Sequence, residues 1–261
     1  MSRSPRKQSR GPFVLHVEVD LPNDPTERAA YPLNIPAIAT LGTLPLHPAV
    51  TFLVGENGSG KSTILEAIAV AVGLNPEGGS RNFNFATRES HSDLYRHLRV
   101  ARSSAMPRDL YFLRAESYFN VASEIEALDR EPVSLPRIID SYGGVSLHEQ
   151  SHGESFFALF QHRLSGPGLY LLDEPEAALS PQRQIAILGL IHSLIGRGSQ
   201  FVIATHSPII LAYPDSAIYS LDSSGVRQTA YRDSDPYRIS RAFLENPELS
   251  IRELLRSDEP A

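Results

Sequence analysis

Hydrophobic positions along the chain predict several strands. Residues 13–20 alternate between apolar and polar side chains, which predicts a half-buried strand. Its apolar face would carry Phe13, Leu15, Val17 and Val19. Nearly continuous apolar runs predict buried strands at 50–54, 109–113, 169–174 and 200–205. The run at 50–54, bounded by Pro48 and Gly55, is typical of a central strand in a parallel sheet.

Longer periodic segments predict helices. Residues 62–72 are almost continuously apolar and end at Gly73, which predicts a buried helix with a glycine stop. Two alternating runs around Ser223, Ser224 and Gly225 predict a hairpin. Residues 74–108 are expected to be mostly irregular, with one short helix near 92–99. Further helices are expected at 156–164, 181–195, 235–246 and 247–256.

The alternation of strands and helices predicts an α/β fold with a mostly parallel sheet flanked by helices. We expect an N-terminal antiparallel β portion and a small helical subdomain, inserted at about 117–160. One domain is expected over 12–261, after a disordered basic tail at 1–11.

Composition limits the functions and cellular locations that are compatible with this sequence. The chain has 261 residues and a net charge of −6, which argues against a surface built mainly to coat nucleic acid. It contains no cysteine, which excludes disulfides and thiolate sites and fits a cytoplasmic location. No apolar stretch is long enough to span a bilayer or to form a signal peptide, so we expect no membrane insertion.

The segment between the strand at 50–54 and the helix at 62–72 matches the phosphate-binding loop pattern G-x-x-x-x-G-K-[ST]. Glycines let successive backbone N–H groups face phosphate oxygens at a helix N-terminus. Lys61 would place its ammonium between the β and γ phosphates, as a catalytic and binding residue, and Ser62 would offer a hydroxyl to Mg²⁺. The residues expected to bind ATP are Gly55, Glu56, Asn57, Gly58, Ser59, Gly60, Lys61, Ser62 and Thr63.

Two adjacent acids, Asp173 and Glu174, end the apolar strand at 169–174. A buried strand has no structural use for paired carboxylates at its end. We expect Asp173 to hold Mg²⁺, directly or through water, and Glu174 to orient or deprotonate the attacking water. The alternative is that the acids only mark where the strand meets solvent, or cap the next helix.

His206 follows the strand at 200–205. Because ligands gather at the carboxyl ends of the strands in an open parallel sheet, Lys61, the acids and His206 are expected to lie at one edge. His206 would donate a hydrogen bond to the γ-phosphate there, and capping of the next segment is the alternative.

The segment HEQSHGES at 148–155 is less specific. Ser151 and Gly153 precede a predicted helix and could present a hydroxyl and N–H groups to an anion. On the residues alone, an ordinary helix N-cap is the favoured interpretation.

Taken in order, the phosphate loop, the segment QSHGE, the acidic strand and the final histidine resemble the ATP-binding-cassette (ABC) ATPases. More closely, the chain is similar to small soluble bacterial proteins described as AAA-family or predicted ATPases. Stretches that carry this resemblance are GENGSGKST, GGSRNFNF, FLRAES, SLHEQSHGES, DEPEAALSPQRQ and ATHSP. It implies a P-loop fold, ATP hydrolysis and a head-to-tail dimer with two sandwiched ATP molecules. It also implies that Ser151 and Gly153 contact the γ-phosphate of ATP bound to the other subunit.

The chain departs from the ABC pattern in places. Its signature is QSHGE rather than L-S-G-G-Q, and Ser180 stands where an aspartate is usual. No glutamine occupies the position expected for the Q-loop, and Glu116 is the nearest substitute. Glu116 is expected to bind metal or water, with a surface ion pair to Arg114 as the alternative.

We expect a soluble Mg²⁺-dependent ATPase whose nucleotide cycle closes and opens a homodimer. The alternatives are the ATP-binding subunit of an ABC transporter and a DNA-repair or defence ATPase acting with an unidentified protein partner. The interval between Lys61 and Ser151 leaves no room for the long coiled coils of chromosome-type relatives. DNA binding would have to use Arg96, Arg99, Arg102 and Arg108, for which solvent exposure or ion pairing is the commoner role.

Overall fold

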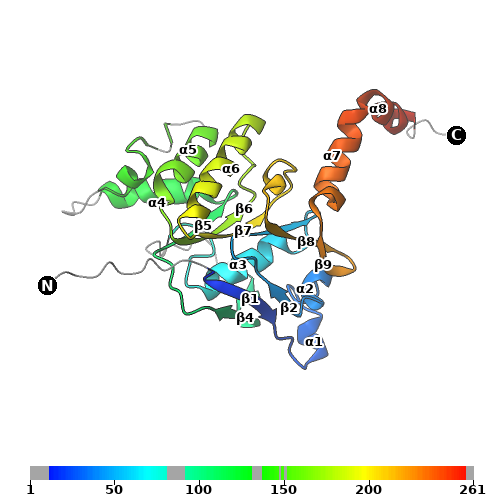
Figure 1. The fold of residues 1–261 in the computed structure, drawn as a ribbon. Coiled ribbons are helices and arrows are strands. Elements are labelled where there is room, and N and C mark those ends of the chain that lie inside the picture. The colour runs from blue at the N-terminus through cyan, green and yellow to red at the C-terminus, as the bar shows by residue number, and fades with distance from the viewer. Residues whose placement is uncertain (1–11, 81–91, 131–136, 147, 150–151, 257–261) are drawn as a thin grey trace.

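The computed structural model describes residues 12–80, 92–130, 137–146, 148–149 and 152–256. Within these ranges the central feature is a six-stranded sheet in the order β5-β6-β7-β3-β8-β9 (Figure 1). Its strands are β3 (Val50–Gly55), β5 (Asp109–Arg114), β6 (Gly168–Asp173), β7 (Gln200–Ala204), β8 (Ser216–Asp222) and β9 (Gly225–Thr229).

Pairing in this sheet is parallel from β5 to β8 and antiparallel only between β8 and β9. The predicted mostly parallel sheet is therefore confirmed, and β3 lies between β7 and β8 as a central strand. The predicted hairpin around 223–225 is also confirmed, because Asp222 pairs with Gly225 across the turn.

A second, antiparallel sheet of three strands lies on one side of the large sheet, in the order β2-β1-β4. It contains β1 (Val14–Val19), β2 (Thr43–Pro45) and β4 (Leu98–Arg102). The prediction that Leu15 belongs to the buried face is wrong, since its side chain is 44% exposed whereas Val14 is buried. The pairing of β1 with β4 shifts between Val14 and His16, so Leu15 is the extra residue of a β-bulge and turns outward.

Residues 100–102 were expected to be irregular, and residues 98 and 99 to end a short helix. Both expectations are wrong, because residues 98–102 form β4. The arginines in LRVAR interrupt the apolar pattern that would indicate a strand. Hydrogen bonding to β1 makes this segment a strand although its local sequence does not predict one. Arg99 forms an ion pair with Asp20, and Arg102 donates a hydrogen bond to the carbonyl of Ala71. These arginines therefore serve the local structure.

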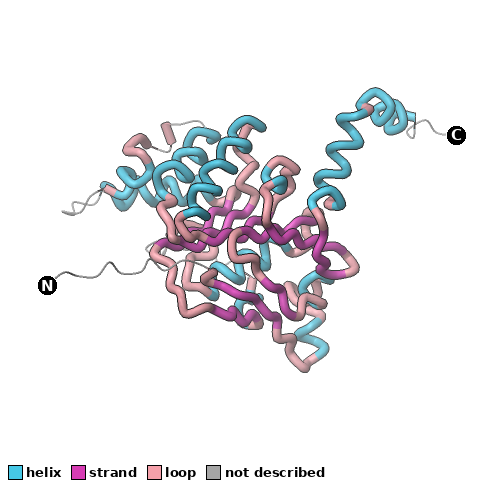
Figure 2. Tube along the Cα trace, in the orientation of Figure 1, coloured by secondary structure: helices cyan, strands magenta, loops and turns pink. Residues whose placement is uncertain are grey.

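Helices cover both faces of the large sheet (Figures 1 and 2). Helix α3 (Lys61–Ala71) packs between the two sheets, and α4 (Tyr118–Arg130), α5 (His152–Ala158) and α6 (Pro181–Gly196) lie on the opposite face. A 3-10 turn at Ile138–Tyr142 and a π-helical turn at Leu159–Arg163 complete that layer. The short helices α1 (Pro25–Arg28) and α2 (Pro36–Ala39) connect β1 to β2.

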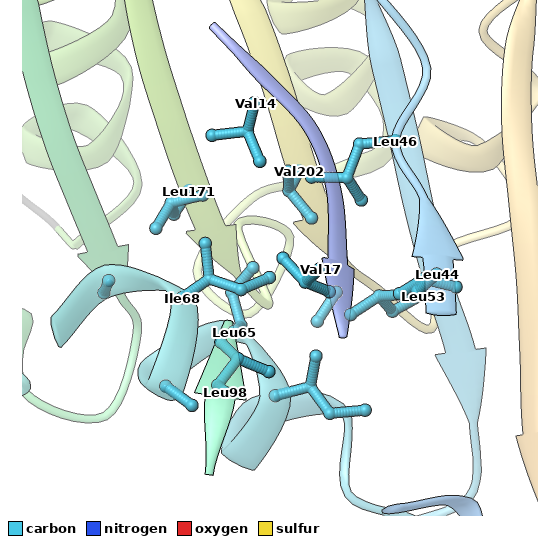
Figure 3. Close-up of a cluster of buried hydrophobic side chains, with 14 of the residues drawn as sticks. Val14, Val17, Leu44, Leu46, Leu53, Leu65, Ile68, Leu98, Leu171 and Val202 are labelled. Carbon is cyan, nitrogen blue, oxygen red and sulfur yellow. The ribbon is translucent and has the colours of Figure 1, made fainter. Parts of the chain in front are cut away.

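Alternate residues of the large sheet feed two hydrophobic clusters. On one face, Leu53 of β3 packs with Leu65 and Ile68 of α3 and with Val17 of β1 (Figure 3). On the other face, Phe52 and its neighbours pack against α4, α5 and α6. The helices predicted near 117–160 therefore share a core with the sheet, while their assignment as a subdomain stays a prediction.

Helices α7 (Asp235–Glu245) and α8 (Pro247–Arg256) project away from the rest of the molecule (Figure 1). They leave large apolar side chains exposed, among them Ile239, Leu244 and Leu254. In the described part of the chain, every helix is too short or too polar to cross a bilayer.

One buried amide joins the two sheets. The Oε1 atom of Gln200 in β7 accepts hydrogen bonds from the backbone N–H groups of Phe13 (2.8 Å) and Val14 (3.0 Å). Its Nε2 group donates to the carbonyl oxygens of Val14 (2.8 Å) and His47 (3.0 Å). The amide thus uses both donors and both acceptor positions, and it ties the start of β1 to the large sheet.

Replacement of this amide should weaken the fold. Gln200→Ala leaves buried backbone groups without partners, so we expect the free energy of unfolding to fall by about 2–4 kcal/mol. Urea denaturation followed by circular dichroism measures this loss. The exposed Gln182→Ala serves as the control, with a change below about 0.5 kcal/mol. Equal stability of the two variants would contradict the joining role of Gln200.

Candidate nucleotide-binding site

The loop between β3 and α3 is shaped by glycines. Gly58 and Gly60 have φ values of +80° and +97°, in the left-handed region that favours glycine. A Cβ atom on Gly55 would lie 2.3 Å from the carbonyl oxygen of Leu221 at the end of β8. The loop therefore bends into a compact turn that only these small residues allow, and it ends at the N-terminus of α3.

Lys61 opens α3, and its ammonium lies inside this turn. The Nζ atom donates to the carbonyl oxygens of Gly55 (2.8 Å) and Glu56 (2.9 Å), and the residue is almost fully buried. Burial lowers the pKa of Lys61, while the nearby carboxylates of Glu174, Asp173 and Glu176 act to raise it. The sequence prediction that Lys61 and the two acids lie together is confirmed by this proximity.

A hydrogen bond links the start of α3 to the end of β6. Ser62 donates through its Oγ atom to Oδ1 of Asp173 at 3.0 Å. Burial raises the pKa of Asp173 to about 6, and Ser62 and Arg114 only partly offset this effect. Glu174 and Glu116 raise it further, because their negative charges disfavour a third one. Asp173 is thus a buried carboxyl group that lacks enough neighbouring positive charge.

These side chains suit a magnesium ion that is shared with phosphates. Among the described residues, no three His, Asp or Glu side chains gather into a protein-only metal cage. Mg²⁺ is usually held by one or two carboxylates together with substrate phosphates and water, so Asp173 and Ser62 are a sufficient protein contribution. In the loop, the Oγ atom of Ser59 is buried and has no hydrogen-bond partner within the described structure. A bound phosphate would give this hydroxyl group an acceptor.

Glu174 has an unusual backbone conformation directly after β6. Its φ is +51°, and its N–H donates to the carbonyl oxygen of Ala204 at 2.9 Å. Non-glycine residues rarely adopt this region, and such positions cluster at functional sites. Oε1 of Glu174 lies 3.5 Å from Nε2 of His206, and both side chains are 39% exposed. The predicted neighbourhood of the acids and His206 is therefore present, and their catalytic roles stay predictions.

Glu116 lies near this edge but points largely into solvent. The register of β5 and β6 places Arg114 opposite Asp173, two residues before Glu116. The Glu116 side chain is 83% exposed and lies 3.4 Å from Nη2 of Arg114. The ion pair considered as an alternative is thus present, and a metal-binding role for Glu116 stays a prediction.

The predicted signature residues are only partly described. Ser151 lies outside the described residues, whereas Gly153 is in the first turn of α5. A Cβ atom on Gly153 would lie 2.7 Å from Nη1 of Arg183 and 2.8 Å from the carbonyl oxygen of Ala178. Close packing against the backbone that leads into α6 therefore favours glycine here, and a contact with phosphate stays a prediction.

Sequence reasoning missed two acids of this site. Glu66 of α3 is buried, accepts a hydrogen bond from the N–H of Ser92 (2.8 Å) and pairs with Arg114 (2.7 Å). An acid inside an otherwise apolar helix was the available signal, because a buried charge needs a partner. Glu176, the third acid of DEPE, accepts hydrogen bonds from the loop that carries His206.

The raised pKa of Asp173 gives a stability prediction. The folded protein holds this proton more tightly than the unfolded chain, so the carboxyl group destabilises the fold as pH rises from 3.8 through about 6. Asp173→Asn keeps an acceptor for Ser62 and removes the charge. We expect it to raise the free energy of unfolding at neutral pH by about 1–3 kcal/mol without nucleotide or metal.

Urea denaturation across the acid to neutral range tests this expectation. The gain of Asp173→Asn should shrink as pH falls through about 6 and vanish only below pH 3.8, where the carboxyl group is protonated in both wild-type states. A variant that is less stable than the wild type at neutral pH would show that the buried charge is already compensated.

Family models match two parts of this chain. Residues 137–212 match a model described as "AAA domain, putative AbiEii toxin, Type IV TA system", and residues 40–120 match one described as "AAA domain". These matches include the loop, the acids and His206.

Curated relatives and solved structures agree with this result. A putative ABC transporter ATP-binding protein of Streptomyces coelicolor is 33% identical over 170 residues, which cover 59% of this chain and 28% of that protein. The cytochrome c biogenesis ATP-binding export protein CcmA of Rhizobium etli is 30% identical over 175 residues, covering 60% and 75%. The chain thus spans 28% of the length of the Streptomyces relatives. The ATP-binding cassette MJ1267 of an ABC transporter, in its ADP conformation, shares the fold with a TM-score of 0.51 at 17% identity, over 83% of this chain and 90% of that one.

Proposed function

Because this chain belongs to the ATP-binding-cassette family of ATPases, we propose that it hydrolyses Mg²⁺-bound ATP to drive the closing and opening of a homodimer. One observation carries the proposal. The hydrogen bond between Ser62 and Asp173 joins the phosphate loop to the acidic strand, and His206 lies beside Glu174 at the same edge. This arrangement supports the proposal that the loop, Asp173 as a metal carboxylate and Glu174 as a base act together on one triphosphate.

In this proposal the loop binds the triphosphate of ATP. Backbone N–H groups of this loop would face the phosphates. The ammonium of Lys61 would exchange its two loop carbonyls for phosphate oxygens. Ser62 and Asp173 would hold Mg²⁺, which neutralises charge on the β and γ phosphates. The cation would also satisfy the buried carboxylate of Asp173, whose ionisation is otherwise unfavourable.

Glu174 and His206 would act on the γ-phosphate. Glu174 orients the attacking water and accepts its proton as the bond to ADP breaks. His206 donates a hydrogen bond to a γ-phosphate oxygen, where negative charge is stabilised. The two side chains lie 3.5 Å apart and each is 39% exposed, so a ligand at this edge of the sheet could contact both.

Dimer formation is the remaining part of the proposal. Ser151 and Gly153 of one subunit would contact ATP bound to the other, so ATP would favour the closed dimer and hydrolysis the open one. A cytoplasmic setting without membrane insertion fits this cycle.

A second candidate is an ATP-binding subunit that works with a membrane transporter. The names of the relatives favour it, since they include ABC transporter ATP-binding proteins and an export protein. The altered signature, Ser180 and the missing Q-loop glutamine disfavour it, because coupling to transport uses those regions. Stable co-purification with one integral membrane protein encoded beside this chain would favour the transporter role over the switch.

Two substitutions separate binding from hydrolysis. Lys61→Ala removes the phosphate-binding ammonium and should weaken ATP binding and abolish turnover. Glu174→Gln keeps the shape and removes the base, so turnover should fall by at least about 100-fold while ATP binding persists. Phosphate release and calorimetric titration with Mg²⁺ and ATP measure the two effects. The exposed Glu248→Gln is the control and should match the wild type.

The same Glu174→Gln variant tests the dimer. With Mg²⁺ and ATP it should sediment as a dimer, and without nucleotide as a monomer, in analytical ultracentrifugation. A variant that stays monomeric at saturating ATP would rule out the dimer cycle. Wild-type turnover in Glu174→Gln would rule out its catalytic role, and absence of ATP binding by the wild type would rule out the proposed function.

A further inference from the structure

Residues 174–180 connect the end of β6 to the start of α6, and we call them the connecting segment. Within an ABC-type cassette this segment usually carries an aspartate where this chain has Ser180, which here caps α6 by accepting a hydrogen bond from the N–H of Arg183. Two separate sets of hydrogen bonds join the segment to residues 205–207, the loop that carries His206.

The first set is centred on Glu176. One oxygen of its carboxylate, Oε1, accepts from Oγ1 of Thr205 (2.7 Å), the N–H of His206 (2.6 Å) and the N–H of Ser207 (3.1 Å). These donors follow the end of β7, where the strand no longer supplies partners. A single side chain therefore sets the course of the backbone on both sides of His206.

The second set runs through Gln184 of α6. Its Nε2 group donates to the carbonyl oxygen of Leu179 (2.9 Å), and its Oε1 accepts from Oγ of Ser207 (2.6 Å). Oγ of Ser207 in turn accepts from the N–H groups of Ile209 and Ile210. The loop is thus fastened at Thr205–Ser207 by Glu176 and again at Ser207 by Gln184.

The other oxygen of Glu176 has a different environment. Oε2 is buried and has no hydrogen-bond partner within the described structure. Within the described structure the hydrogen bonds of the carboxylate are all made by Oε1, and the side-chain oxygen of a glutamine is also an acceptor for hydroxyl and N–H donors. The hydrogen bonds that shape the loop therefore require an acceptor at this position and no proton transfer.

We propose that Glu176 is a positioning residue for the ATPase reaction, which fixes His206 beside Glu174 through Oε1, with Gln184 as the second support of the same loop. The proposal rests on the proposed function. It gives a role to Glu176, the third acid of DEPE, which is neither a proposed metal ligand nor the proposed base. Because a small misplacement of a catalytic group can cost about 100-fold in rate, loss of this support should lower turnover more than ATP binding.

A series of substitutions at Glu176 tests this role. Glu176→Ala should lower kcat by about 10- to 100-fold with a change in KM for ATP below about 3-fold, since the loop loses three hydrogen bonds. Glu176→Gln keeps the acceptor and should retain kcat within about 3-fold of the wild type. This rescue distinguishes Glu176 from Glu174, where the same change to Gln should lower turnover by at least about 100-fold.

Gln184→Ala and Glu248→Ala complete the series. Gln184→Ala keeps the Glu176 contacts and should lower kcat by less than Glu176→Ala, with KM unchanged. It also keeps the test decisive if Glu176→Ala does not fold. The exposed Glu248→Ala is the matched control for a Glu→Ala change and should not differ from the wild type.

A readout independent of turnover follows the histidine itself. In ¹⁵N-histidine NMR spectra, the signal that His206→Asn removes identifies His206. That signal should shift in Glu176→Ala and return to its wild-type position in Glu176→Gln. If the wild type hydrolyses no ATP, the proposed function fails while these spectra still decide whether Glu176 positions His206.

Two results would overturn the inference. Equal loss of kcat in Glu176→Gln and Glu176→Ala would mean that the charge of Glu176 acts in the chemistry. Wild-type kcat and an unshifted His206 signal in Glu176→Ala would mean that the loop does not depend on Glu176. Wild-type kcat in Gln184→Ala would remove Gln184 from the proposal.

Discussion

The hydrogen bond from Ser62 to Asp173 connects the two halves of the candidate site. Ser62 lies in the first turn of α3, and Asp173 is the last residue of β6. Their contact depends on the packing of α3, since Leu65 and Ile68 hold this helix between the large sheet and β1 (Figure 3). A helix whose buried face fixes its position can hold its N-terminus against a neighbouring strand end within the tolerance that phosphate binding needs.

Charged groups are buried in the candidate site, at a cost in electrostatic free energy. Lys61 and Asp173 are both buried, and burial disfavours the charged form of each. The two extensive hydrophobic clusters stabilise the sheet on either side and can support such a cost. Buried charges without full compensation are typical of sites that await a charged ligand, and a nucleotide with its metal supplies both signs of charge.

Ion pairs and polar side chains around the site hold its surroundings in place. Glu66 and Arg114 link α3 to the end of β5, beside Asp173. Glu176 and Gln184 link the segment after β6 to the loop after β7. The sequence departs from the ABC pattern at Ser180 and Glu116. Ion pairs and hydrogen bonds nevertheless connect the ends of neighbouring strands around the site.

The local sequence determined the parts of the fold that are contiguous in the chain. The strand–loop–helix unit at 50–72 was predictable because its glycines, lysine and apolar periodicity act over a few residues. Asp173 and Glu174 were predictable from their place where an apolar strand ends. Tertiary structure alone decided the outward turn of Leu15 and the existence of β4. It also decided which backbone groups Gln200 and Glu176 bind through hydrogen bonds. These features depend on partners far away in sequence, such as Phe13 for Gln200 and Arg102 for Val14, and a local pattern carries no information about which distant groups will complete its hydrogen bonds.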